Sequence, residues 1–400
     1  MTAVVRIAPA EGGLLRVITP PPGDGGPAPS VLDPAPGVDV AVLEVAGGLL
    51  TWSVLALDAV PVAVLDDVDL AQGWVWALYG EQVALALADD TVTESAPEQP
   101  EPVEVPVLPV LPVLPALPAL VVSARQLAFA HWAARWWPAS VIDDIPPLDE
   151  RLLDREIGDL TEECDLLFAG EETADSRPSD GPDAESAAVE KPPRASDYAL
   201  AAGPAAGTGT AGPAGAGGLT LARGTGGSDW RRCPPGLVDA SERAVSWEVV
   251  RAAARTTVSV SVVAAPGPVT VPSELTPRAT VSGAADPLDL ALRLVDDAWL
   301  GDAPFDTVRP GDPAPGGAGL AVDIYLPGFG TPRPHDRYHD QEAAAEVRAR
   351  IRALVRSRLA RATGEDGDRD RDRDRDEDGD SAPGPLLRTE IAAATAETDF

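Results

Sequence analysis

The chain of 400 residues is poor in cysteine, histidine and lysine, the side chains that serve disulfides, metal sites and much of catalysis. It has two cysteines, three histidines, a single lysine and no asparagine. Two cysteines, Cys164 and Cys233, fit a reducing compartment better than a disulfide scaffold in so long a chain. Glycines and Glu11 interrupt any apolar run near the start, so we expect no signal peptide and a cytoplasmic protein.

The short motifs of common catalytic and metal sites are also missing. The chain contains no G-x-S-x-G, no G-x-x-x-x-G-K-[ST], no paired C-x-x-C and no H-E-x-x-H. His335 and His339 stand four residues apart, but Pro332 and Pro334 precede them and no third soft ligand follows at the usual spacing. We therefore predict no catalytic residue, no metal and no cofactor. An alternative stays open, an enzyme of unfamiliar type with His131 and carboxylates in a cleft.

Acidic residues outnumber basic ones by 64 to 31, which gives a net charge of −33. Such a surface repels nucleic acid and anionic membranes and favours basic partners, so we expect protein partners and no nucleic acid or membrane. The one uncharged run that is long and apolar enough for a transmembrane segment, residues 105–124, contains five prolines. Each proline would remove a helical hydrogen bond inside a bilayer, and this excludes a transmembrane helix there.

Proline recurs at every third position between Val105 and Leu120. Three residues make one turn of a polyproline II helix, so we predict an extended proline-rich linker over residues 97–120. Leu108, Leu111 and Leu114 would form one exposed ridge of it. The segment is then either a plain spacer or a ligand for an aromatic groove on another protein or on this one.

Residues 1–96 have the pattern of a small β-rich domain. Expected strands lie near 38–45, 49–56 and 60–65. Trp74 and Trp76 would alternate on one strand of a hairpin, facing leucines across a turn at Gly80.

Residues 121–170 change to a helical period and predict a helical hairpin. Phe129, Trp132 and Trp136 form one stripe that Pro138 ends, and Asp149 is placed to cap the second helix. Trp137 must point away from that stripe. Trp136 and Trp137 are therefore either core residues or an aromatic platform for proline-rich sequence.

Residues 171–217 read as an acidic, then Ala/Gly/Pro-rich linker, and residues 218–332 as an antiparallel β-sandwich of immunoglobulin-like type. Its expected core includes alternating valines, an alternating leucine strand from Leu288 to Leu294, and the three tryptophans Trp230, Trp247 and Trp299. An arginine-rich helix should follow at 333–363 and a disordered tail at 364–400. Arg348, Arg352 and Arg356 would form a stripe on that helix, either solvated or docked on the protein's own acidic surface.

The expected fold is mainly β with α additions, joined by long disordered linkers. The expected function is that of a non-catalytic scaffold or adaptor whose tethered modules contact other proteins. Besides an enzyme, a small-ligand sensor that uses the sandwich is a further alternative. The candidate contact residues are Trp136, Trp137, Leu108, Leu111, Leu114, Arg348, Arg352 and Arg356.

Overall fold

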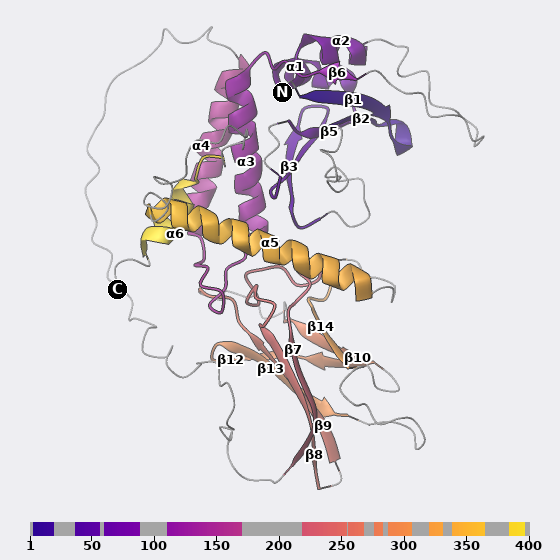
Figure 1. The fold of residues 1–400 in the computed structure, drawn as a ribbon, viewed down its shortest axis with the longest axis vertical. Helices are drawn as coiled ribbons and strands as arrows, with labels where there is room; N and C mark the ends of the chain where they lie inside the picture. Colours follow the sequence, from indigo (N-terminus) through magenta and orange to yellow (C-terminus); the bar gives the residue numbers. More distant parts are fainter. Residues whose placement is uncertain are drawn as a thin grey trace, which may run out of the picture.

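The computed structural model describes residues 3–19, 37–56, 60–88, 110–169, 218–253, 255–267, 276–282, 287–305, 320–330, 338–364 and 384–396. These residues form three sheets of antiparallel strand pairs and six α-helices (Figure 1). The fold is therefore mixed α/β, with a larger helical share than the sequence pattern predicts.

The N-terminal sheet has the strand order β3-β4-β5-β2-β1-β6. Its strands are β1 (Val4–Pro9), β2 (Leu15–Ile18), β3 (Val40–Val45), β4 (Gly48–Ser53), β5 (Val62–Leu65) and β6 (Leu111–Pro112), and a short 3₁₀ helix, η1 (Glu11–Gly13), joins β1 to β2. The three strands expected near 38–45, 49–56 and 60–65 are confirmed as β3, β4 and β5.

The proline-rich segment departs from the predicted rod where it is described. Leu111 pairs with Val5 in β6, Val113 is buried, and Pro118 begins helix α3 (Pro118–Trp136). Proline suits the first turn of a helix because its missing N–H has no intrahelical partner there. Residues 110–120 are thus part of the folded body, and residues 97–109 of the predicted linker lie outside the described residues.

The predicted hairpin around Trp74 is wrong, because this segment forms helices α1 (Val68–Tyr79) and α2 (Glu81–Ala88). Asp67 caps α1 by accepting a hydrogen bond from the Leu70 backbone N–H at 3.0 Å, and Gly80, at φ 97°, separates the helices. Trp74 is buried whereas Trp76 is 46% exposed, so they do not share a face. Apolar residues fill nearly every position here, so their alternation did not distinguish strand from helix.

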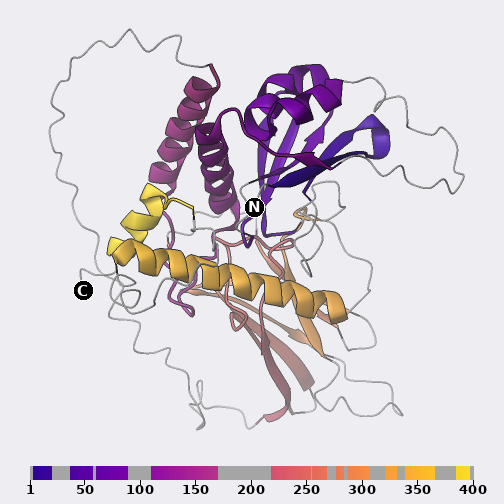
Figure 2. The same ribbon diagram turned by 45° about the horizontal axis from the view of Figure 1, so that its top comes forward.

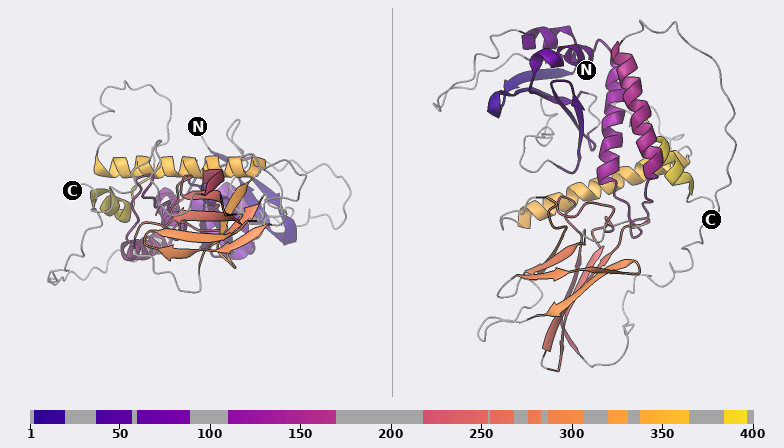
Figure 3. Two further views of the ribbon diagram at one scale, coloured as in Figure 1. Left: turned by 90° about the horizontal axis from the view of Figure 1, so that it is seen from below. Right: turned by 180° about the vertical axis from the view of Figure 1, so that it is seen from behind.

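Helices α3 and α4 (Glu150–Ala169) lie side by side, as expected for residues 121–170 (Figure 3). Asp149 caps α4 by accepting from the Leu152 N–H at 3.0 Å. Phe129 stacks on Trp132 with ring centroids 5.2 Å apart, and Trp132 Nε1 donates to the Val38 carbonyl at 2.7 Å. The helices and the N-terminal sheet therefore share one hydrophobic core.

The C-terminal strands form two sheets, of order β12-β13-β9-β8-β7 and β11-β10-β14. The strands are β7 (Leu219–Gly226), β8 (Val245–Ala252), β9 (Arg255–Val263), β10 (Arg278–Ser282), β11 (Leu288–Ala291), β12 (Arg293–Val295), β13 (Ala298–Pro304) and β14 (Ala321–Tyr325). Side chains of both sheets, among them Val260 and Ile324, share a second core. The immunoglobulin-like topology stays a prediction.

Two details of this region differ from expectation. The leucine strand predicted from Leu288 to Leu294 is divided, since Leu290 belongs to β11 in one sheet and Leu294 to β12 in the other. Trp230 is buried in the first core, not in the sandwich, whereas Trp299 is buried in the sandwich as expected. The alternation of leucines along the sequence continues unchanged where the chain leaves one sheet and joins the other, so it could not predict this division.

Helix α5 (Tyr338–Thr363) crosses between the paired helices and the C-terminal sheets (Figure 2). Ile351, Val355 and Leu359 are buried on it. The predicted disordered tail is corrected in part, because residues 388–396 form α6 (Arg388–Ala396) and Leu387 is fully buried. The linker at 171–217 and residues 365–383 and 397–400 lie outside the described residues. None of the described helices combines the length and apolar character that crossing a membrane requires.

Candidate functional site

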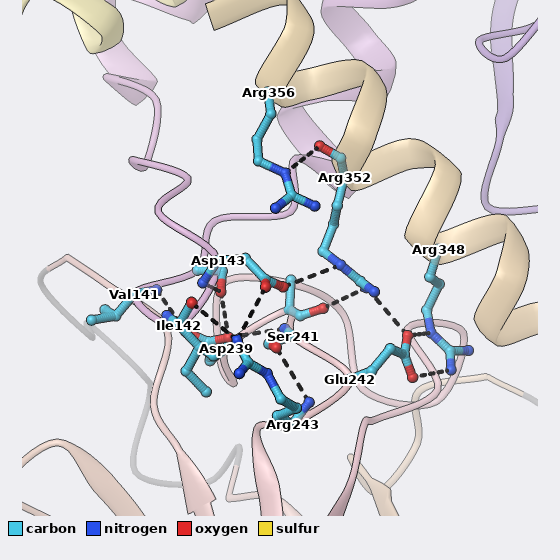
Figure 4. Close-up of polar contacts among 12 residues, drawn as sticks. Val141, Ile142, Asp143, Asp239, Ser241, Glu242, Arg243, Arg348, Arg352 and Arg356 are labelled. Atoms are coloured by element: carbon cyan, nitrogen blue, oxygen red, sulfur yellow. Dashed lines mark hydrogen bonds and ion pairs between the residues drawn. The ribbon is translucent and has the colours of Figure 1, made fainter. Parts of the chain in front are cut away.

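Two arginines of α5 point at the loop that precedes β8 (Figure 4). Arg348 donates from Nε and Nη2 to the carboxylate of Glu242 at 2.7 and 2.9 Å. Arg352 donates from Nη1 to the Ala240 carbonyl at 3.0 Å and pairs through Nε with Asp143 at 3.2 Å. Both arginines are buried, and bidentate contacts of this kind are stronger and more directional than exposed ion pairs. We call this set the arginine–carboxylate junction.

A single carboxylate fastens the α3–α4 connection to the same loop. Asp239 is fully buried and accepts hydrogen bonds from Ser140 Oγ at 2.7 Å, from the Val141 N–H at 2.7 Å and from the Ser241 N–H at 2.9 Å (Figure 4). A buried carboxylate is tolerated only where such donors replace water. Asp239 therefore fixes the connection after α3 to the loop that precedes β8 in the C-terminal sheets.

The predicted arginine stripe is largely turned inward. Of the two expected arrangements, Arg348 and Arg352 adopt the one that docks on the protein's own acidic side chains. Arg356 is exposed and donates from Nε to the Arg352 carbonyl at 3.4 Å. The carboxylates that hold the stripe are Glu242 and Asp143. They were not identified as its partners from the sequence, since 64 acidic residues give no means of choosing among them.

Trp136 and Trp137 have different environments. Trp137 follows the last residue of α3, is buried, and donates from Nε1 to the Pro146 carbonyl at 2.9 Å. Trp136 is half-buried, and the guanidinium carbon of Arg135 lies 5.2 Å from its ring centroid. Trp137 is therefore a core residue, whereas Trp136 lies partly at the surface.

The guanidinium of Arg135 is also close to an aromatic ring from the other end of the chain. Its carbon lies 5.9 Å from the ring centroid of Phe329, which follows β14. Arg135 is exposed, and none of the ion pairs within the described residues uses it. We call Arg135, Trp136 and Phe329 the Arg135 surface. Sequence reasoning could not find it because Phe329 lies far from Arg135 along the chain.

A second arginine–aromatic pair lies next to Phe329 in the sequence. The guanidinium of Arg232 is 5.1 Å from the Tyr325 ring and pairs with Asp323. The Leu326 N–H donates to the Arg232 carbonyl at 2.8 Å, which anchors the start of the loop that carries Phe329. The aromatic member of this pair, Tyr325, therefore lies on the strand that leads into the loop of Phe329.

The predicted leucine ridge is not formed by the described residues. Leu111 is half-buried in β6, Leu114 is 61% exposed, and Leu108 lies outside the described residues. Leu111 pairs in a β-strand, so the backbone there does not follow the three-residue turn of polyproline II that would place the leucines on one ridge.

The histidines and cysteines have no common site in the described part of the chain. His131 is exposed on α3, where partial burial lowers its pKa, and the side chains of His335 and His339 lie outside the described residues. Cys164 and Cys233 are unpaired. The described residues hold no group of three or more histidine, cysteine, aspartate or glutamate side chains arranged for a metal ion.

Comparisons with models of known protein families, with curated proteins and with solved structures found no match. The described residues form a mixed α/β protein with mostly antiparallel sheets, an internal arginine–carboxylate junction, and an exposed arginine beside two aromatic rings.

Proposed function

We propose that the protein is a non-catalytic scaffold or adaptor that binds other proteins, and that the Arg135 surface is one of its contact sites. The observation that carries the proposal is an exposed guanidinium flanked by two half-buried aromatic rings, with no ion pair among the described residues. Arginine, tryptophan and other aromatic residues are the types enriched at the energetic centres of protein interfaces. A guanidinium stacked on rings keeps its N–H groups free for a partner.

The arginine–carboxylate junction supports this proposal by making the surface rigid. Trp136 ends α3, whereas Phe329 follows β14 in the C-terminal sheets, so both rings lie beside Arg135 only while these parts keep their relative position. Asp239 and Arg352 both tie the connection after α3 to the C-terminal half. A contact site assembled in advance loses less entropy when it binds.

We also propose that the protein acts in the cytoplasm and that its C-terminal sheets form an immunoglobulin-like sandwich. Two unpaired cysteines support the first point. The core shared by a five-stranded and a three-stranded sheet supports the second.

The test is affinity capture with the tagged full chain, followed by mass spectrometry. Trp136→Ala and Arg135→Gln are compared with the wild type and with Trp76→Ala, a matched control at an exposed tryptophan of α1. We expect a partner that the wild type and the control retain and that both site variants lose. Retention by all four proteins excludes this surface, and turnover of a metabolite without any retained partner favours the enzyme alternative.

A further inference from the structure

An exposed apolar patch lies where the end of α4 meets α1, at the same end of the molecule (Figure 1). Leu70, Gly73 and Trp76 follow one another at every third residue on one side of α1, and Leu70 and Trp76 are 63% and 46% exposed. Phe168 of α4 is 50% exposed and covers Gly73, because a Cβ atom built on this glycine would lie 2.8 Å from Phe168 Cζ. We call Leu70, Trp76 and Phe168 the Trp76 surface.

The glycine at position 73 indicates that Phe168 is seated on α1 and does not extend freely into solvent. Glycine inside a helix costs about 1 kcal/mol relative to alanine. A methyl group at this position would collide with the ring, so Gly73 leaves the space that Phe168 occupies. The three side chains therefore form one apolar surface, and contiguous exposed surfaces of this kind mark sites where another molecule binds.

The charged side chains nearest to this surface in the sequence are all carboxylates. They are exposed and belong to Asp66, Asp67, Asp69 and Asp165. Helices α1 and α2 and the part of α4 after Arg155 contain no lysine, arginine or histidine. None of the ion pairs within the described residues uses these four carboxylates. The Trp76 surface is therefore an apolar patch with unneutralised negative charge at its margin.

We propose that the Trp76 surface binds a basic amphipathic helix of a partner protein. Leu70 and Trp76 are six residues apart, which is about 9 Å along α1. Apolar residues at positions i, i+3, i+4 and i+7 of a partner helix cover a similar length, so they can pack on both side chains and on Phe168. Lysine and arginine on the flanks of that helix would pair with the carboxylates at the margin.

This inference goes beyond the proposed function, because the Trp76 surface is separate from the Arg135 surface. Helix α3 begins beside α1, where the Leu117 N–H donates to the Ala77 carbonyl at 3.0 Å. Arg135 lies in the last turn of α3, about 25 Å from its first residue. The two surfaces can therefore be tested independently of each other.

Charge complementarity selects a basic helix over the other occupants of an apolar surface. A symmetric contact between two copies would bring the carboxylates of both Trp76 surfaces together, and like charges across an interface repel. An anionic membrane is repelled for the same reason. A basic helix instead neutralises Asp69 and Asp165, which have no counter-ion among the described residues.

The experiment measures the fluorescence anisotropy of a dye-labelled synthetic peptide as the full chain is added. The peptide has about 14 residues, with leucines at the helical spacing i, i+3, i+4 and i+7 and lysines at the other positions. A scrambled peptide of the same composition has the same charge but no apolar face. A chain with a net charge of −33 attracts any cationic peptide, so the test is the difference between the two peptides and between variants.

We expect the amphipathic peptide to bind the wild type about tenfold more tightly than the scrambled one, as a contact with an aromatic centre should. Trp76→Ala and Phe168→Ala should each remove most of this difference. Leu166→Ala is the matched control, because Leu166 is 67% exposed in the same turn of α4 but points about 200° away from Phe168. It should bind both peptides as the wild type does.

A pair of charge variants tests the carboxylates at the margin. Asp69→Asn combined with Asp165→Asn should weaken binding of the amphipathic peptide and reduce its dependence on salt concentration. Glu248→Gln combined with Asp302→Asn changes the net charge equally at two exposed carboxylates of β8 and β13. This control should weaken binding much less.

A further variant, Gly73→Ala, tests the seat of Phe168 without removing any side chain. Alanine is the better helix former, so α1 should be retained, while the new methyl group displaces the ring. We expect weaker binding of the amphipathic peptide with no loss of helical circular dichroism. This result does not depend on a truncated side chain.

Three outcomes overturn the inference: equal affinity for the two peptides, equal affinity of wild type and Trp76→Ala, and equal weakening by the two charge variants. Dimers of the full chain that Trp76→Ala abolishes in sedimentation would also overturn it, because they assign the surface to a second copy. None of these outcomes alters the proposed function. Its test depends on Arg135 and Trp136, and a partner bound there should be retained by Trp76→Ala.

Discussion

Arg358 on α5 donates two hydrogen bonds to Glu390 on α6, from Nε at 2.6 Å and from Nη2 at 2.7 Å, and both side chains are buried. Glu390 also accepts from the Leu387 N–H at 2.7 Å. The guanidinium of Arg358 lies 4.3 Å from the Phe129 ring and donates to the Pro385 carbonyl at 2.9 Å. The C-terminal helix is thus held by a buried pair whose remaining donors and acceptors are also used.

Replacing Glu390 with glutamine should destabilise the protein strongly. The change leaves the Arg358 charge buried without its counter-ion, which costs about 3–5 kcal/mol in comparable cases. Urea unfolding followed by circular dichroism measures the loss. Arg388→Gln is the matched control, because the Arg388–Asp159 pair is 63% and 54% exposed and should contribute less than about 1 kcal/mol. Equal losses in the two variants would mean that the buried pair does not anchor α6.

Asp239→Asn should weaken the connection between α3 and the C-terminal sheets with almost no change in volume. Asparagine keeps one acceptor oxygen, which can still accept from Ser140 and Ser241, but its amide nitrogen cannot accept the hydrogen bond that the Val141 N–H donates to the second carboxylate oxygen. We expect a loss of about 1–3 kcal/mol in the free energy of unfolding, the usual result of leaving a buried donor unsatisfied. Hydrogen exchange should accelerate first at Val141. Unchanged protection there would show that other contacts hold the connection.

Local patterns predicted those elements whose stabilising contacts are near in sequence. The stripe of Phe129 and Trp132 and the cap at Asp149 are visible within a few turns, and α3 and α4 follow from them. Helix α6 could not be predicted in this way, because its cap comes from Glu156 of α4. The Arg388 backbone N–H donates to the Glu156 carboxylate at 2.8 Å. That partner is distant in the chain, so a short tail segment carries no sign of it.

The residues of the candidate site also divide into those that local sequence patterns can indicate and those that only the folded structure brings together. Two adjacent tryptophans at a helix end cannot both continue one stripe, so one of them was expected near the surface. The stripe pointed to Trp137 as that residue, and this is wrong, because Trp137 is buried and Trp136 is the half-buried one. Phe329 could not be found, since only the packing of the C-terminal sheets against the end of α3 brings it to Arg135. The predicted arginine stripe was present, but its partners Glu242 and Asp143 decided that it faces inward.

Substitutions at the two adjacent tryptophans should separate a core role from a surface role. Trp137→Ala removes a buried indole and its hydrogen bond to Pro146, and we expect a loss of about 3–5 kcal/mol. Trp136→Ala removes a half-buried ring that stacks with Arg135 and should cost about 1 kcal/mol or less. Chemical denaturation of both variants tests this. Similar losses would place Trp136 in the core and remove it from the proposed contact site.

The pH dependence of stability should include a small contribution from Asp289 on β11. The hydrogen bonds of Arg278 hold the pKa of Asp289 below its ordinary value of 3.8, with a further bond from Tyr325. A lowered folded-state pKa stabilises the protein above the unfolded-state value, and this stabilisation is lost as the pH falls through the folded-state pKa. Because the pair is partly exposed, solvent screening keeps the effect small.

An NMR titration of the Asp289 carboxyl group measures this directly. In Arg278→Gln its pKa should rise toward 3.8, and the stability difference between variant and wild type should disappear in strong acid. A pKa that stays low in the variant would assign the shift to Tyr325 instead.

The two free thiols should react very differently with iodoacetamide. Burial, together with the charges of Glu163 and Asp165, raises the pKa of Cys164 to about 11, and burial raises that of Cys233 to about 12. The thiolate is the reactive form, so at pH 8 only about one Cys164 in a thousand is ionised, and its labelling should accelerate about tenfold per pH unit. Cys233 is fully buried in the second core and should be labelled only when the C-terminal sheets open.

Mass spectrometry of the native and the urea-unfolded chain, with Cys164→Ser to assign the signals, measures both rates. Labelling of Cys233 ahead of Cys164 in the native protein would mean that the C-terminal core opens more readily than α4, contrary to the packing of the two regions.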